Sequence, residues 1–188
     1  MVFYKGQRVE SEKRKNFTNA GYDVSHFETG SANKNYNQMI AGLFETHLYV
    51  RSLEKSVEFY RNTLNLELCY YKQERRAAFF WIGKPKEAML GLWEKPEGEI
   101  ESRHFAFRCD VDDVLYNVVP FLIQRNLKPR NFLRDGSEKP MVFAWMPAIA
   151  IYFDDPDGHE LEFIAMLEGE GKPRLGIVSY DQWLEQTS

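Results

Sequence analysis

Residues 152–162 read YFDDPDGHELE, and this stretch decides the fold. Its centre, residues 154–158, has the chemistry of a tight turn. Proline fixes its own φ, glycine permits positive φ, and aspartate side chains bond to nearby backbone. Apolar and β-branched residues precede the turn at 149–153 and follow it at 160–166. The pattern predicts two strands joined by this turn, with Glu162 as a polar residue inside the second strand.

One order of elements occurs twice along the chain. Each copy begins with a strand that contains a histidine, continues with a helix, and ends with strand-like runs. The first copy is expected to comprise a strand over 44–50, a helix capped by Ser52, and strands over 66–71, 77–82 and 88–93. The second is expected to comprise a strand over 103–109, a helix capped by Asp112 and kinked at Pro120, a short strand over 131–133, and the two strands beside the turn. The sequence therefore predicts an α+β fold of two β-α-β-β-β modules.

The chain divides into three parts by composition. We expect a polar N-terminal arm over 1–40, a folded domain over 41–168 with modules at about 43–94 and 102–167, and a C-terminal tail over 169–188. The arm carries charge clusters and many Asn, Ser and Gly, and it shows no sustained strand or helix periodicity.

The composition argues against several classes of function. The 188 residues include 24 Lys and Arg against 28 Asp and Glu, a net charge of −4, so there is no basic surplus for nucleic acid or an anionic membrane. No apolar run approaches the roughly 18 residues of a transmembrane helix. The N-terminus lacks the apolar segment of a signal peptide, so we expect a cytoplasmic protein. The two cysteines, Cys69 and Cys109, exclude a disulfide framework.

Three polar residues in the predicted strands are candidates for metal ligands. Two of them occupy equivalent positions in the two modules, and the third interrupts an apolar strand. His47 and His104 occupy the first strand of each module, 57 residues apart, and Glu162 follows 58 residues after His104. Two imidazoles and one carboxylate that project from rigid strands can form a facial set for a divalent metal, with positions left for water and substrate. The alternative is that each is an ordinary, partly exposed strand residue.

Four segments together resemble a known family. They are THLYV at 46–50, LEKSVEFY at 53–60, RHFAF at 103–107, and YFDDPDGHELE at 152–162. The chain over roughly 43–167 resembles the vicinal oxygen chelate superfamily, which includes glyoxalase I, fosfomycin-inactivating thiol transferases, extradiol dioxygenases, methylmalonyl-CoA epimerase and bleomycin-sequestering proteins.

This resemblance implies that the two modules pair into a curved, partly closed eight-stranded sheet. It also implies that the concave side holds one divalent metal ion (Zn, Mn, Ni, Mg or Fe) at His47, His104 and Glu162, with Glu162 also the catalytic residue. Such a metal acts as a Lewis acid that chelates two neighbouring oxygens of a small-molecule substrate. The resemblance further implies a homodimer, in which modules pair within one chain or between two.

The branches of the superfamily differ at a few positions. In glyoxalase I the metal site has four ligands, one of them a carboxylate in the last strand of the first module. The matching position in this chain is near Gly91, which has no carboxylate. The fosfomycin transferases usually carry Thr two residues after the first His, where this chain has Tyr49. The extradiol signature needs a His six to eight residues before Tyr152, and the chain has none there. We expect a metal-dependent enzyme of the glyoxalase and fosfomycin-resistance kind. The alternatives are an Fe(II)-dependent extradiol-type dioxygenase and a non-catalytic small-molecule-binding (resistance) protein.

Two further side chains are candidates for contacts with the substrate. Tyr49 shares a strand face with His47, and Arg108 shares one with His104. Arginine can grip a carboxylate or phosphate through two hydrogen bonds, and tyrosine offers a hydrogen bond or a proton. The apolar segment 140–147 is either a wall of the pocket or a core strand or dimer contact.

Overall fold

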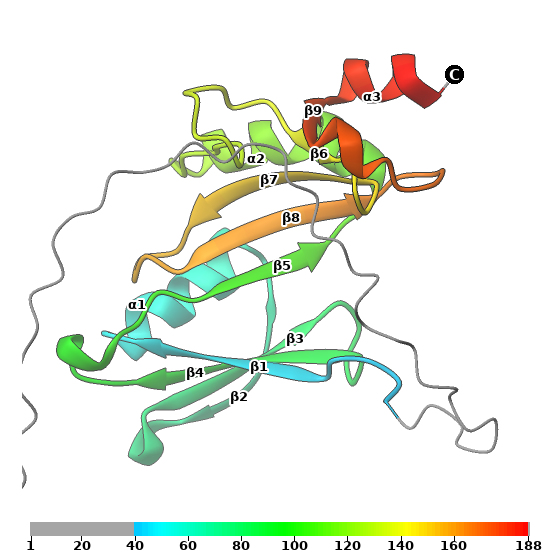
Figure 1. The fold of residues 1–188 in the computed structure, drawn as a ribbon. Coiled ribbons are helices and arrows are strands. Elements are labelled where there is room, and N and C mark those ends of the chain that lie inside the picture. The colour runs from blue at the N-terminus through cyan, green and yellow to red at the C-terminus, as the bar shows by residue number, and fades with distance from the viewer. Residues whose placement is uncertain (1–39, 188) are drawn as a thin grey trace, which may run out of the picture.

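Two mixed β-sheets with few helices form the computed structural model, which describes residues 40–187 (Figure 1). The strand orders are β1-β4-β3-β2 in one sheet and β5-β8-β7-β6-β9 in the other. The first module comprises β1 (Glu45–Val50), α1 (Leu53–Glu58) with a π-helical turn (Phe59–Thr63), β2 (Glu67–Lys72), β3 (Ala77–Ile82) and β4 (Ala88–Glu94). The rest comprises β5 (His104–Arg108), a π-helical turn (Asp113–Asn117), α2 (Val118–Gln124), β6 (Met141–Phe143), β7 (Ala148–Asp154), β8 (Glu160–Met166), β9 (Ile177–Ser179) and α3 (Tyr180–Thr187).

The predicted α+β class and the two β-α-β-β-β modules are confirmed. In each module the first and last strands are parallel neighbours, β1 with β4 and β5 with β8, and the other pairs are antiparallel. The sheets do not close into a barrel, and β1 and β5 are edge strands that face each other (Figure 1). A ninth strand, β9, extends the second sheet by pairing with β6. Among residues 40–187, no helix combines the length and hydrophobicity that crossing a bilayer requires.

The helix starts differ between the modules. Ser52 caps α1 as predicted, because its hydroxyl accepts a hydrogen bond from the Lys55 N–H at 3.5 Å. The predicted cap at Asp112 is wrong: its backbone is already helical, and its side chain makes no capping bond. Pro120 has no N–H to donate to the preceding turn of the helix. The π-helical turn, which is wider than an α-helical one, ends at Asn117, just before this proline.

Strand alternation sorts the side chains of β1 between the core and an open face. Leu48 and Val50 are buried, whereas His47 and Tyr49 lie on the opposite face. The same core receives residues of α1, β3 and β4 and also residues of the second module, so the two modules share it. Its buried members are Leu48, Val50, Leu53, Phe59, Tyr60, Ala78, Phe80, Leu90, Leu92, Phe107, Leu122, Phe153 and Leu161.

The turn that follows β7 docks onto the first module. The Asp157 carboxylate accepts hydrogen bonds from the Arg51 guanidinium at 2.8 Å and from the Ser56 hydroxyl at 3.0 Å. Gly158 has a φ of +83°, as the turn chemistry predicts. The residues that decide the fold thus also join the two modules.

The apolar segment 140–147 contributes a core strand. Val142 and Phe143 in β6 are buried, and β6 lies between β7 and β9. The predicted short strand over 131–133 is wrong, because only Arg130 forms an isolated bridge, with Tyr152.

Candidate functional site

His104 and Glu162 lie together on the open face of the second sheet. β5 and β8 are parallel neighbours, and the register sets Ala106 beside Glu162 and His104 beside Glu160. The His104 Nε2 is 3.1 Å from the Glu162 Oε2. The imidazole is half-exposed, whereas the Glu162 side chain is only 5% exposed, so the pair sits at the boundary between the core and the open face.

The contacts of His104 define what its two ring nitrogens can do. Its Nδ1 lies 3.1 Å from the backbone carbonyl oxygen of Glu160. A carbonyl oxygen only accepts hydrogen bonds, so Nδ1 carries the proton of this contact. The Nε2 then turns its lone pair, or a second proton, toward the Glu162 carboxylate. A lone pair beside a carboxylate needs a cation between them, and this arrangement is typical of a metal-ligating imidazole.

The Glu162 carboxylate is buried and only partly satisfied. Its Oε1 has no hydrogen-bond partner among the described residues. Burial raises the pKa of Glu162, and the neighbouring Tyr152 and His104 oppose that rise. The Tyr152 ring stacks on His104 with centroids 5.7 Å apart. Burial, and then the negative charge of Glu162, raise the pKa of Tyr152, so its hydroxyl stays protonated near neutral pH.

His47 lies on the first sheet, directly over Gly91. The register pairs the two residues across β1 and β4, so no carboxylate occupies this position, as the sequence indicated. A Cβ atom at Gly91 would come within 2.6 Å of the His47 Cδ2 and 3.0 Å of the Phe79 ring. The His47 Nε2 is 3.5 Å from the Glu45 Oε2. The absence of a side chain at Gly91 therefore leaves room for the His47 imidazole.

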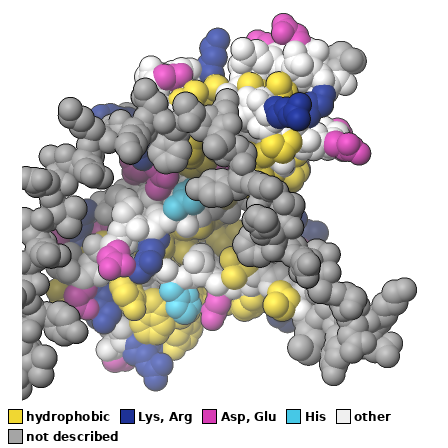
Figure 2. Space-filling model, viewed as in Figure 1, with side chains coloured by type: hydrophobic (Ala, Val, Ile, Leu, Met, Phe, Trp, Pro, Cys, Tyr) yellow, Lys and Arg dark blue, Asp and Glu magenta, His cyan; other side chains and the backbone are white. Residues whose placement is uncertain are grey.

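The single chain keeps His47 apart from the other two predicted ligands. Figure 2 shows two separate histidine patches on one face of the molecule, one over each sheet. The exposed histidines of residues 40–187 are His47 and His104, because His159 is buried. In this part of the chain no three His, Cys, Asp or Glu side chains converge closely enough to hold a metal ion. The structure thus brings His104 and Glu162 together and sets His47 on the same open face at a distance from them.

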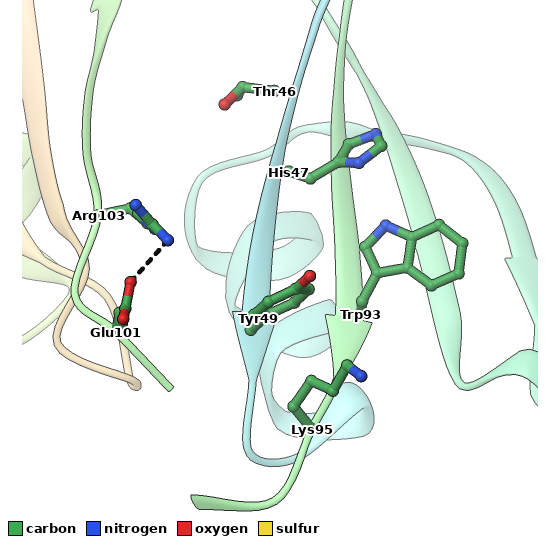
Figure 3. A pocket seen from close by; sticks show the side chains of 7 residues that line it. All are labelled: Thr46, His47, Tyr49, Trp93, Lys95, Glu101 and Arg103. Atoms are coloured by element: carbon green, nitrogen blue, oxygen red, sulfur yellow. Dashed lines mark hydrogen bonds and ion pairs between the residues drawn. The ribbon is translucent and has the colours of Figure 1, made fainter. Parts of the chain in front are cut away.

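The two predicted substrate contacts line different pockets. Tyr49 lines an open pocket of about 620 Å³ together with His47 and Trp93 (Figure 3). Arg108 lines another of about 560 Å³, which lies at the start of β1 and the end of β5. Trp93, in β4, forms part of the wall of the first pocket.

Several residues near the candidate site were missed at the level of sequence. Lys95 and Arg103 line the same pocket as Tyr49, but they flank the strands, where no periodicity marks their direction. Tyr152 is a buried aromatic residue of β7. Its contact with His104 depends on the pairing of β7 with β8, which the sequence predicted without a register.

Comparisons with known proteins agree with this architecture. A family model described as the Glyoxalase/Bleomycin resistance protein/Dioxygenase superfamily matches residues 41–163. The chain is 30% identical over 135 residues to the uncharacterized protein YraH of Bacillus subtilis (strain 168), a match that covers 66% of this chain and 98% of YraH.

Two solved structures extend the comparison. An integron cassette protein from the mobile metagenome of the Halifax Harbour sewage outfall is 31% identical, with a TM-score of 0.58, and the match covers 68% of this chain and all of that one. The fosfomycin resistance protein FosX from Listeria monocytogenes is 25% identical, with a TM-score of 0.50, over 70% of this chain and 96% of that one.

Proposed function

The chain belongs to the Glyoxalase/Bleomycin resistance protein/Dioxygenase superfamily, and from this premise we propose that it is a metal-dependent enzyme of the glyoxalase and fosfomycin-resistance kind. The observation that carries the proposal is the pair of His104 and Glu162. A buried carboxylate oxygen without a hydrogen-bond partner lies beside an imidazole whose other nitrogen is already engaged. Buried polar groups are rarely left unpaired in native proteins, and a divalent cation would satisfy both groups at once.

The donor set fits such an ion. His104, Glu162 and His47 would hold it through two imidazole nitrogens and one carboxylate, a set that suits Zn, Mn, Ni or Fe. When bound, the ion would supply Lewis-acid stabilisation of the oxyanion that forms on a substrate with neighbouring oxygens. The Oε1 oxygen of Glu162, which has no hydrogen-bond partner among the described residues, would be the acceptor for a substrate proton. The protonated Tyr152 hydroxyl lies on the same side of the sheet and could donate a hydrogen bond.

We include a homodimer in the proposal. The placement of His47 apart from His104 and Glu162 supports it, because a second copy could bring its own His47 to this pair. The similarity to Listeria FosX supports the enzyme class.

One observation favours a different class of function. The same separation of His47 from the other two ligands is what a small-molecule-binding protein without metal would show. The dioxygenase alternative draws on the Tyr152, Asp155 and Glu162 positions of the turn motif.

The test is the metal content of the purified full chain after incubation with Zn²⁺, Mn²⁺, Ni²⁺, Mg²⁺ and Fe²⁺ and desalting. The variants are His104→Ala and Glu162→Gln, and His26→Ala, outside the superfamily match, is the matched control. The proposal predicts close to one ion per chain, lost in the first two variants and kept in the control. Fe²⁺ retention with oxygen uptake on catechols would favour the dioxygenase. Absence of any retained ion would overturn the metal site and favour the binding protein.

A further inference from the structure

An open pocket extends from His47 and Tyr49 toward Lys95, at the strand ends of the first module. Its volume is about 620 Å³. Of the three proposed metal ligands only His47 lines it. Figure 3 shows Tyr49 and Trp93 beside His47 on one side, and Arg103 on the other side pointing toward them. The pocket is therefore a chamber next to the candidate metal site.

Aromatic rings form one wall of this chamber. The register of β1 and β4 sets Tyr49 next to Trp93, and His47 next to Gly91. The Trp93 ring lies 6.0 Å from His47 and 5.7 Å from Phe79, centroid to centroid. Tyr49 is 44% exposed and Trp93 is partly exposed, so both rings are accessible to a ligand. Figure 2 shows hydrophobic side chains gathered around the histidine patch on this sheet. Such a held, flat surface suits a planar apolar group.

Cations stand at the rim of the same chamber. The Lys95 amino group is 5.5 Å from the Tyr49 ring centroid and pairs with Glu99 at 3.6 Å. The Arg103 guanidinium pairs with Glu101 at 2.7 Å, and its side chain is 58% exposed. Exposed ion pairs of this kind contribute little stability, so they open readily for a competing anion. The guanidinium has five N–H donors, so Arg103 can also bind a carboxylate through two parallel hydrogen bonds.

We propose that this pocket binds a planar unsaturated acid, an aromatic or conjugated carboxylate. Its flat part lies against Trp93 and Tyr49, and its carboxylate meets Arg103. The statement that this acid is the substrate rests on the proposed function, whereas the statement that it binds rests on the pocket alone. The aromatic wall suits a planar group better than a strongly hydrated, non-planar anion. The lining carries two cations, Lys95 and Arg103, against one carboxylate, Glu101, so its net charge favours an acid over a base.

The experiment is calorimetric titration of the full chain with three probes: trans-cinnamate, its neutral amide cinnamamide, and the non-planar cyclohexanecarboxylate. Trans-cinnamate should bind at least about tenfold more tightly than either of the others. Arg103→Gln should remove most of the preference for cinnamate over cinnamamide and leave cinnamamide binding unchanged. Trp93→Leu should weaken both. Arg61→Gln, an exposed arginine outside the pocket, is the matched control and should change neither.

The result that overturns the proposal is equal binding of cinnamate and cinnamamide, or cinnamate binding that Arg103→Gln does not change. Circular dichroism of each variant shows whether it is folded, and Arg103 is exposed enough that its loss should not unfold the chain. Repeating the titration with metal-free and metal-loaded protein separates the two proposals. Retained metal without cinnamate binding contradicts the pocket alone, and cinnamate binding by a chain that retains no metal contradicts the proposed function alone.

Discussion

The Tyr60 hydroxyl donates a hydrogen bond of 2.8 Å to the Asp155 carboxylate, and it joins residues that lie 95 positions apart. Tyr60 follows α1 in the first module, and Asp155 stands in the turn between β7 and β8. Both are buried, at 0% and 6% exposure. The other Asp155 oxygen accepts the backbone N–H groups of Asp157 and His159, so this one carboxylate organises the turn and fastens it to the other module.

We therefore expect Tyr60→Phe to destabilise the protein without changing its fold. The substitution keeps the ring in the core but leaves one Asp155 oxygen buried and without its donor. The cost should be about 1–3 kcal/mol, the range for a buried polar group that loses its partner. Urea unfolding followed by circular dichroism measures it. Tyr116→Phe, at a tyrosine that is 68% exposed, is the control. Equal stability of the two variants would show that the bond contributes nothing across the modules.

The sequence predicted most of the strands because they alternate clearly or are uniformly apolar. The bounds of β3 and β8 match the predicted 77–82 and 160–166. The short strand β6 was harder to predict, since an apolar run bounded by prolines suits a core strand, a pocket wall or a dimer contact equally well. The predicted cap at Asp112 is wrong because the helical segment begins at Val111, so Asp112 already lies inside it.

The candidate site was predictable where it depends on strand alternation and not where it depends on the placement of modules. His104 and Glu162 meet because each lies on the open face of neighbouring strands. The position of His47 relative to them depends on how two modules sit together, which no local pattern records. His159 shows the same limit. Its ring bridges the Arg103 N–H and the Tyr49 carbonyl, at 3.1 and 2.8 Å, and these backbone atoms lie far away in sequence.

Gly91 offers a direct test of the place of His47. We expect Gly91→Ala to displace the His47 imidazole, because the new Cβ would lie 2.6 Å from its Cδ2. If His47 is a ligand, metal affinity should fall about tenfold or more, since misplacing one of three ligands weakens such sites strongly. Competition with a chromogenic chelator measures this affinity.

The control for this substitution is Gly98→Ala, where a Cβ meets nothing within 4 Å. Adding His47→Ala to Gly91→Ala should recover part of any lost thermal stability, because the imidazole that clashes is gone. Unchanged metal affinity in Gly91→Ala would argue that His47 takes no part in the site.

Arg76 links two carboxylates in the first module and predicts an acid-sensitive contribution to stability. Its guanidinium bonds to Glu54 at 2.6 and 2.8 Å and also to Glu94. These hydrogen bonds hold the pKa of Glu54 at about 2 and lower that of Glu94. A carboxyl with a lowered folded-state pKa stabilises the fold above its ordinary value of 4.5, and this stability is lost as the pH falls toward about 2.

Arg76→Gln should therefore lower the melting temperature near neutral pH, and its difference from the unsubstituted chain should shrink as the pH approaches about 2. The effect is small, because the groups are solvent-accessible. Differential scanning calorimetry at a series of pH values gives both curves. Arg75→Gln, at the exposed neighbouring arginine, should show no such pH dependence. A difference that stays constant with pH would mean that Arg76 acts through packing alone.

Mixing two variants that each lack one proposed metal ligand shows whether the modules of the proposed homodimer pair within one chain or between two. Suppose that each site takes His47 from one chain and His104 with Glu162 from the other. Purified His47→Ala and Glu162→Ala chains, unfolded together and refolded, then form mixed dimers with one intact ligand set and one doubly damaged set. Metal content should rise from near zero in either chain alone to about one ion per mixed dimer, whereas pairing within a chain leaves it near zero. The refolded unsubstituted chain shows how much metal the procedure itself recovers. Recovery of metal only in the mixture would establish that a second copy completes the site, because no folded single chain in that mixture carries both His47 and Glu162.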